Sequence, residues 1–172
     1  MPMEKVKIVV DADVIIHFSK GERLHMLPSI FPEYDFLVLH IVRNELLGPI
    51  RQELDRQESL MKNIATIEFD PAGDMLHEYM ALTATFGKGE SACMAYCRFT
   101  NNAIGSSNLR DIKDYCQEHQ ITYLTTLDFL YYALQRGKMT IQECNEFIQL
   151  VRSKDSKLPN IDIAQYIPSV QL

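Results

Sequence analysis

The sequence lacks the long apolar runs and the cysteine pairs that mark membrane proteins and zinc-binding folds. No apolar run in its 172 residues approaches the roughly 20 that a membrane-spanning helix needs, and a strand-like pattern replaces the apolar region of a signal peptide. We therefore expect a cytoplasmic protein. The cysteines form no CxxC pair and have no histidine at zinc-ligand spacing, so we expect buried thiols at Cys93, Cys97, Cys116 and Cys144.

An excess of positive charge is also absent. The chain has 17 Lys and Arg against 23 Asp and Glu, a formal net charge of −6. This balance argues against broad, non-specific binding to nucleic-acid phosphates and leaves local basic patches open. Repeats and low-complexity segments are missing too, and the 47% of hydrophobic residues is typical of one globular domain. We expect a single domain over residues 1–153 and an irregular C-terminal extension over 154–172 that folds back on it.

Short apolar runs alternate with longer amphipathic segments along the chain. The runs predict strands near residues 6–10, 36–40, 64–68, 103–107 and 121–125. Helices are expected between them: two short ones within 13–32, one over 41–60 that Pro49 kinks or interrupts, and others at 72–86, 89–100, 109–119, 127–136 and 140–153. The alternation predicts a three-layer α/β/α fold around a central parallel sheet of about five strands.

Acidic residues stand where the expected strands end and the expected helices begin. Asp11 ends the first apolar run, and Asp13 follows before the chain returns to the core. Open parallel sheets place their ligand crevice at the carboxyl ends of the strands. Further polar residues in comparable places are Glu45, Glu90, Asn108 and Asp111. Carboxylate oxygens from several such places suit Mg²⁺ or Mn²⁺, so the pattern indicates a metal site.

Each of these residues also has a purely structural interpretation. Asp11 and Asp13 are suitable helix caps, and for Asp13 capping is the preferred interpretation. Glu45, Glu90 and Asp111 suit the first turn of a helix, where the helix dipole favours acids. The histidines lie at no useful metal spacing and are expected to be surface or packed residues: His17, His25, His40, His77 and His119.

Several segments together resemble the PIN domain, a family of mostly metal-dependent ribonucleases that includes the toxins of many bacterial toxin–antitoxin pairs. The resemblance extends from Val6 to about Lys138. It rests on Val9-Val-Asp-Ala-Asp-Val-Ile-Ile16, on Asn44-Glu45 opening the helix after the second strand, on Gly89-Glu-Ser-Ala92, and on Leu124-Thr-Thr-Leu-Asp-Phe-Leu130 followed by Ala133 and Arg136-Gly-Lys138. The order and spacing of these segments carry the match.

The resemblance implies that Asp11, Glu45 and Glu90 are metal-binding, catalytic acids. A fourth acid normally follows the fourth strand of the family, and this chain has Asn108 there, so Asp111 is expected to supply the charge. Ser106 or Asn108 would orient water or phosphate, and contacts with RNA are expected from Lys88, Arg110 and Lys113. The implied partners are RNA, an antitoxin protein and further copies of the chain in a homo-oligomer.

Two alternatives stay open at this point. Because Asn108 replaces an acid, the chain is alternatively a catalytically weakened PIN-like module for binding or assembly. The run around Asp11 also fits a haloacid dehalogenase-like phosphatase, with Asp11 as nucleophile and Asp13 as general acid. That class needs a downstream lysine and a later pair of acids, and no convincing pair is found.

Overall fold

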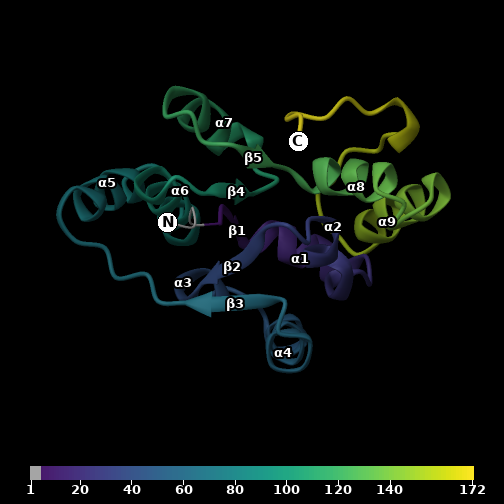
Figure 1. Cartoon of the computed structure of the whole chain (residues 1–172), viewed down its shortest axis with the longest axis horizontal. Helices are drawn as coiled ribbons and strands as arrows, with labels where there is room; N and C mark the ends of the chain where they lie inside the picture. The colour runs from purple at the N-terminus through teal and green to yellow at the C-terminus, as the bar shows by residue number, and fades with distance from the viewer. Residues whose placement is uncertain (1–4) are drawn as a thin grey trace.

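The computed structural model describes residues 5–172 and contains one parallel sheet of five strands, in the order β3-β2-β1-β4-β5 (Figure 1). The four residues that open the expected 1–153 domain lie outside the described residues. All five expected strands form within a few residues of the expected places: β1 (Lys7–Val10), β2 (Asp35–Leu39), β3 (Ile64–Ile67), β4 (Ala103–Gly105) and β5 (Tyr123–Leu124). The prediction of a central parallel sheet is confirmed.

Helices cover both faces of the sheet (Figure 1). One layer contains α1 (Ala12–Lys20), α2 (Leu27–Ile30), α4 (Gly48–Arg56), α8 (Thr126–Gln135) and α9 (Ile141–Ser153), with contacts from α1 to α4, α8 and α9. The other contains α3 (His40–Arg43), α5 (Gly73–Thr83), α6 (Lys88–Thr100) and α7 (Leu109–Glu118), with α6 in contact with the other three. Shorter turns are η1 (Leu24–Met26), the π-helical η2 (Gln57–Met61) and η3 (Ile163–Gln165). The three-layer α/β/α prediction is confirmed.

The helix expected over residues 41–60 is divided. The segment α3 ends at Arg43, α4 begins at Gly48, and Pro49 stands in the first turn of α4. Proline has no backbone N–H and its ring clashes with the preceding turn of a helix, so a continuous helix through Pro49 is disfavoured. The expectation that Asn44-Glu45 opens a helix is wrong, because Asn44 caps the C-terminus of α3 and Glu45 lies in the turn before α4.

The sheet lies inside the core. In β1, the side chains of Ile8, Val9 and Val10 are at most 1% exposed, as expected for a central strand covered on both faces. All four cysteines are free and buried, which confirms the expectation of buried thiols. Within residues 5–172, no helix has both the length and the apolar character needed to cross a bilayer.

The C-terminal extension folds back on the domain, as expected. Its anchor is Asp128, a fully buried residue of α8 whose Oδ1 accepts hydrogen bonds from the Tyr166 hydroxyl (2.8 Å) and the Ser169 N–H (2.7 Å). The Tyr132 hydroxyl donates a further hydrogen bond to the Val170 carbonyl, at 2.6 Å. These bonds hold residues 166–170 against α8, beside the end of β5 (Figure 1).

Candidate functional site

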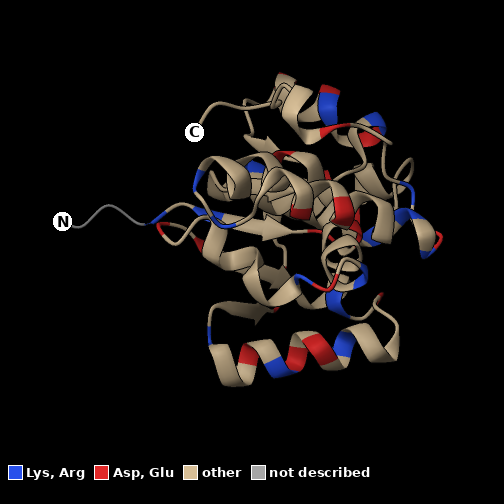
Figure 2. Cartoon of the chain, turned by 90° about the vertical axis from the view of Figure 1, so that its right-hand side faces the viewer, with Lys and Arg blue, Asp and Glu red and all other residues tan. Residues whose placement is uncertain are grey.

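The polar residues gather where β1 and β4 end side by side. From β1 the chain passes to β2 on one side of the sheet, and from β4 it passes to β5 on the other side. Such a reversal is the topological switch point at which open α/β sheets bind ligands. The Asp11 N–H donates to the Gly105 carbonyl at 2.8 Å, which keeps the two strand ends together. In the view of Figure 2, several red Asp and Glu segments lie near the middle of the molecule.

Asp11 is the most buried acid of the group, with 6% of its surface exposed. It caps α1, and its Oδ1 accepts from the Ala12 N–H at 2.8 Å. Burial raises the pKa of Asp11 well above its ordinary value, and the negative charges of Asp13, Glu90 and Glu45 raise it further, while the Ala12 hydrogen bond opposes them. Helix capping and metal binding are compatible for Asp11, because the cap uses only one of its two carboxylate oxygens.

The preferred interpretation of Asp13 as a cap is corrected in position: Asp11 is the N-cap residue of α1, and Asp13 lies in its first turn. Its Oδ1 accepts from the Val14 N–H at 2.7 Å, and its Oδ2 accepts from the Ser107 N–H at 2.9 Å. Burial raises the pKa of Asp13 to about 6, although these backbone hydrogen bonds lower it in part. Asp13 therefore links the start of α1 to the turn that follows β4.

Glu45 reaches the site from an exposed turn. Its Oε1 accepts a hydrogen bond from the Gly89 N–H, at 3.0 Å, in the first turn of α6. The contact depends on glycine, because a Cβ built on Gly89 would lie 2.7 Å from both carboxylate oxygens of Glu45. The glycine of the Gly89-Glu-Ser-Ala92 motif thus makes room for an acid from another element.

Glu90 and Asp111 are joined by the amide of Asn108. The Asn108 Nδ2 donates to Glu90 Oε1 at 3.0 Å and to Asp111 Oδ2 at 2.8 Å. Burial raises the pKa of Glu90 to about 7, with further increases from the carboxyl groups of Asp111 and Asp13, while the Asn108 hydrogen bond opposes them. Asn108 therefore lies between two carboxyl groups as a hydrogen-bond donor.

A buried polar chain that the sequence did not reveal supports the turn after β4. The Ser107 Oγ lies 2.5 Å from the Thr126 Oγ1 and accepts from the Thr126 N–H at 2.9 Å. Thr126 Oγ1 lies 2.7 Å from the Nδ1 of His17, whose pKa burial lowers to about 4. His17 is packed, as expected, but it also connects α1 to the starts of α7 and α8. The local sequence gives no signal for these polar contacts, because Thr126 is 109 residues from His17.

The residues expected to contact substrate differ in their access to solvent. Ser106 is fully buried, and its Oγ lies 3.5 Å from Asp13 Oδ2 and 3.4 Å from the Asn108 nitrogen. Ser106 was expected, with Asn108, to orient water or phosphate, and its burial places its hydroxyl inside the turn rather than on the surface. Asn108 is exposed, and so are the three basic residues expected to contact RNA, Lys88, Arg110 and Lys113.

The carboxylate oxygens of the site are the ligand type that a hard divalent cation prefers, but the side chains are not arranged around a common point. In residues 5–172, no three Asp, Glu, His or Cys side chains form a ready-made group for a metal ion. Several donor oxygens instead accept hydrogen bonds, as in Asp11, Glu45 and Glu90. Burial and, after it, repulsion by neighbouring acids raise the pKa of Asp11, and a cation bound among these carboxylates would relieve the repulsion. The residues fit Mg²⁺ or Mn²⁺ if these side chains turn toward the ion.

A cavity of about 280 Å³ lies away from the acids. Its lining includes Arg98, His119 and Thr122, and it contains none of the acidic residues of the candidate site. A pocket of this size suits a small molecule, whereas a polymer with exposed phosphates reaches a more open site. The chemistry of the charged residues, rather than enclosure, therefore identifies the candidate site.

The chain was compared with known families, curated proteins and solved structures. No family model and no curated protein matches the chain. Among solved structures, a PilT N-terminus domain protein from the hyperthermophilic archaeon Sulfolobus solfataricus P2 is similar, with 12% identity, a TM-score of 0.47, and coverage of 76% of this chain and 95% of that one. The three layers and the acids at the carboxyl edge of the sheet are the arrangement that the sequence resemblance implies.

Proposed function

We propose that this protein, whose fold is PIN-like, is a metal-dependent ribonuclease that hydrolyses RNA phosphodiester bonds in the cytoplasm. The observation that supports the proposal is electrostatic: acids from separate segments act on one buried carboxyl group. Burial is the largest cause that raises the pKa of Asp11, and the charges of Asp13, Glu90 and Glu45 raise it further. Crowded acids at a switch point destabilise the metal-free protein, which favours a role that needs them together.

The acids would hold Mg²⁺ or Mn²⁺, with Asp11 as the central ligand and Glu45, Glu90 and Asp111 beside it. A bound cation supplies Lewis-acid stabilisation of phosphate oxygens and lowers the pKa of a bound water. The protein's own groups orient the reactants: Asn108 is exposed beside Glu90 and Asp111 and would hydrogen-bond a water or a phosphate oxygen. Asp13, held by Ser107, keeps the turn that carries Asn108 in place.

RNA is the proposed substrate because exposed cations lie on the helices that carry the acids. Lys88 precedes Gly89 and Glu90 at the start of α6, and Arg110 and Lys113 flank Asp111 in the first turns of α7. Cationic side chains bind the phosphate backbone without reading its sequence. We expect these three residues to set affinity and its salt dependence rather than the choice of cleavage site.

A second candidate function is supported by Asn108. Its amide spans Glu90 and Asp111, where the resemblance to PIN domains implies an acid and a metal. If that bridge persists in the presence of metal, the protein is a catalytically weakened module that binds or assembles without cleaving. A toxin role, an antitoxin partner and a homo-oligomeric state come from the family resemblance, and they stay proposals.

Cleavage of single-stranded RNA by purified protein distinguishes the two candidates. The ribonuclease proposal predicts cleavage with Mn²⁺ or Mg²⁺, none with EDTA, and none by Asp11→Asn. Asp114→Asn is the matched control, because Asp114 is an exposed acid of α7 with no part in the proposed site. Activity that survives in Asp11→Asn would refute the proposed site, and metal binding without cleavage would favour the binding module.

A further inference from the structure

The turn that carries Glu45 has carbonyl groups that no helix satisfies. The N–H groups of Asn44, Glu45 and Leu46 bond back to carbonyls of residues 40, 42 and 43, at 3.0–3.1 Å. The helical hydrogen bonds do not continue through the carbonyls of the turn, because α4 is a separate helix that begins at Gly48 and Pro49 has no N–H to donate. Backbone carbonyls left in this way accept from side chains or from water.

Arg51 supplies the donor. Its Nη2 donates to the Asn44 carbonyl and to the Leu46 carbonyl, at 3.0 Å each, so one guanidinium holds the peptide groups on both sides of Glu45. Leu46 is 2% exposed and anchors the same turn in the core. The backbone at Glu45 is thereby fixed, while the Glu45 side chain remains on the surface.

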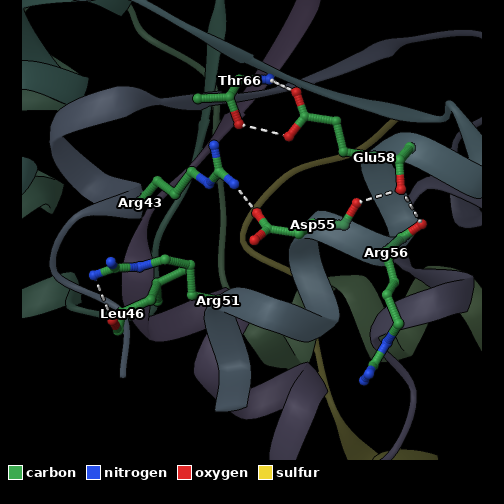
Figure 3. Close-up of polar contacts among 8 residues, drawn as sticks. Arg43, Leu46, Arg51, Asp55, Arg56, Glu58 and Thr66 are labelled. Carbon is green, nitrogen blue, oxygen red and sulfur yellow. Dashed lines mark hydrogen bonds and ion pairs between the residues drawn. The ribbon is translucent and has the colours of Figure 1, made fainter. Parts of the chain in front are cut away.

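The helix that carries Arg51 is itself tied to the sheet (Figure 3). Arg43 of α3 forms an ion pair with Asp55 of α4. In η2, the Glu58 carboxylate accepts from the Thr66 N–H (2.8 Å) and the Thr66 Oγ1 (2.9 Å), and Thr66 belongs to β3. A continuous set of polar contacts therefore connects the sheet to Glu45 through α4.

We propose that Arg51 is a positioning residue, which acts on the candidate site by holding the Glu45 carboxylate against the Gly89 N–H. The positioning of Glu45 by Arg51 does not depend on the proposed function, but its expected effect on metal binding rests on that function. The Arg51 guanidinium itself is engaged with the Asn44 and Leu46 carbonyls. Its effect passes through the turn, because Glu45 Oε1 meets Gly89 3.0 Å away on α6.

The first test needs no metal. Charge-assisted hydrogen bonding to Glu45 shifts the Gly89 amide proton in an NMR spectrum, and Glu45→Ala defines its position without that bond. Arg51→Ala should move the Gly89 resonance most of the way to the Glu45→Ala position, and Arg51→Lys should move it less. Arg56→Ala removes the same charge from an exposed side chain that points away from the cluster in Figure 3, and should leave it unchanged. An unmoved Gly89 resonance in both Arg51 variants would overturn the inference.

The second test is calorimetric titration with Mn²⁺. Changes in residues that orient metal ligands commonly cost about 10- to 100-fold in affinity, and we expect a loss in that range for Arg51→Ala. In a Glu45→Gln background the same change should have no further effect, because Arg51 acts through Glu45. An equal loss in both backgrounds would indicate a general structural defect and contradict the inference. If the wild-type protein binds no Mn²⁺, the proposed function fails, and the Gly89 resonance alone decides the role of Arg51.

Discussion

Replacing Gly89 by alanine separates the stability of the fold from the arrangement of the acids. An added Cβ would lie 2.7 Å from both Glu45 carboxylate oxygens and 2.9 Å from the Glu45 Cδ. Carbon and oxygen atoms do not approach so closely without a shift. The atoms in the way belong to the end of a flexible, exposed side chain, so Glu45 moves rather than the backbone.

The expected cost to the fold is small. Alanine in place of glycine within a helix gains roughly 0.5–1 kcal/mol through backbone entropy. Loss of the hydrogen bond between the Gly89 N–H and the exposed Glu45 carboxylate removes about 1 kcal/mol. These effects oppose each other, so the free energy of unfolding should change by less than about 1 kcal/mol. Metal affinity should fall by about tenfold or more, because Glu45 no longer reaches the site.

Thermal unfolding and calorimetric titration with Mn²⁺ measure the two effects on the same samples. Gly87→Ala is the matched control, because a Cβ at Gly87 meets nothing within 4 Å. That control should bind Mn²⁺ like the wild-type protein. If Gly89→Ala binds Mn²⁺ as tightly as the wild-type protein, Glu45 is not a ligand held by Gly89 and our interpretation of that contact is wrong.

Three further predictions concern single side chains. Burial raises the pKa of Glu90 from 4.5 to about 7, so its contribution to stability is complete below about 4.5 and is lost as the pH rises through 7. Glu90→Gln should therefore raise the melting temperature of the metal-free protein at about pH 8 and change it little at about pH 4, and the reverse order would contradict that pKa. Asn108→Asp adds a carboxylate beside Asp111, so it should tighten Mn²⁺ binding and raise nuclease activity. Both gains should require Glu90. Equal Mn²⁺ affinity of the two proteins in calorimetry would mean that Asp111 already supplies the ligand or that no metal binds. Asp128→Ala should lower the free energy of unfolding by at least about 3 kcal/mol, because the buried Asp128 carboxylate accepts four hydrogen bonds. It should also expose residues 166–170 to proteolysis. An unchanged melting temperature would contradict the role of Asp128 as the anchor.

Local sequence patterns were enough to predict the sheet and the acids at its edge. The apolar run before Asp11 is a buried strand, and Glu90 and Asp111 do lie in the first turns of helices. Such patterns work because burial of both faces of a parallel strand and the start of a helix each leave a short, continuous signal. The same reasoning located Asn108, whose position after β4 depends only on the preceding strand.

Side-chain contacts across turns and between distant segments were beyond local patterns. Asp13 resembles a helix cap, yet one of its oxygens accepts from the Ser107 N–H, 94 residues away. Pro49 signals a break, but nothing local shows that Arg51 then donates to the carbonyls on both sides of Glu45. These interactions depend on how strand ends and helices meet in three dimensions, which hydrophobic periodicity does not encode.

The most direct test of the central claim is anomalous scattering from a crystal of the protein grown with Mn²⁺. The account predicts a manganese peak at the ends of β1 and β4, in direct coordination with Asp11 and with at least one of Glu45, Glu90 and Asp111. It also predicts that this peak is lost in Asp11→Asn crystals grown in the same way. Crystals with no manganese among these residues at saturating Mn²⁺ would contradict the claim that the acids form a metal site.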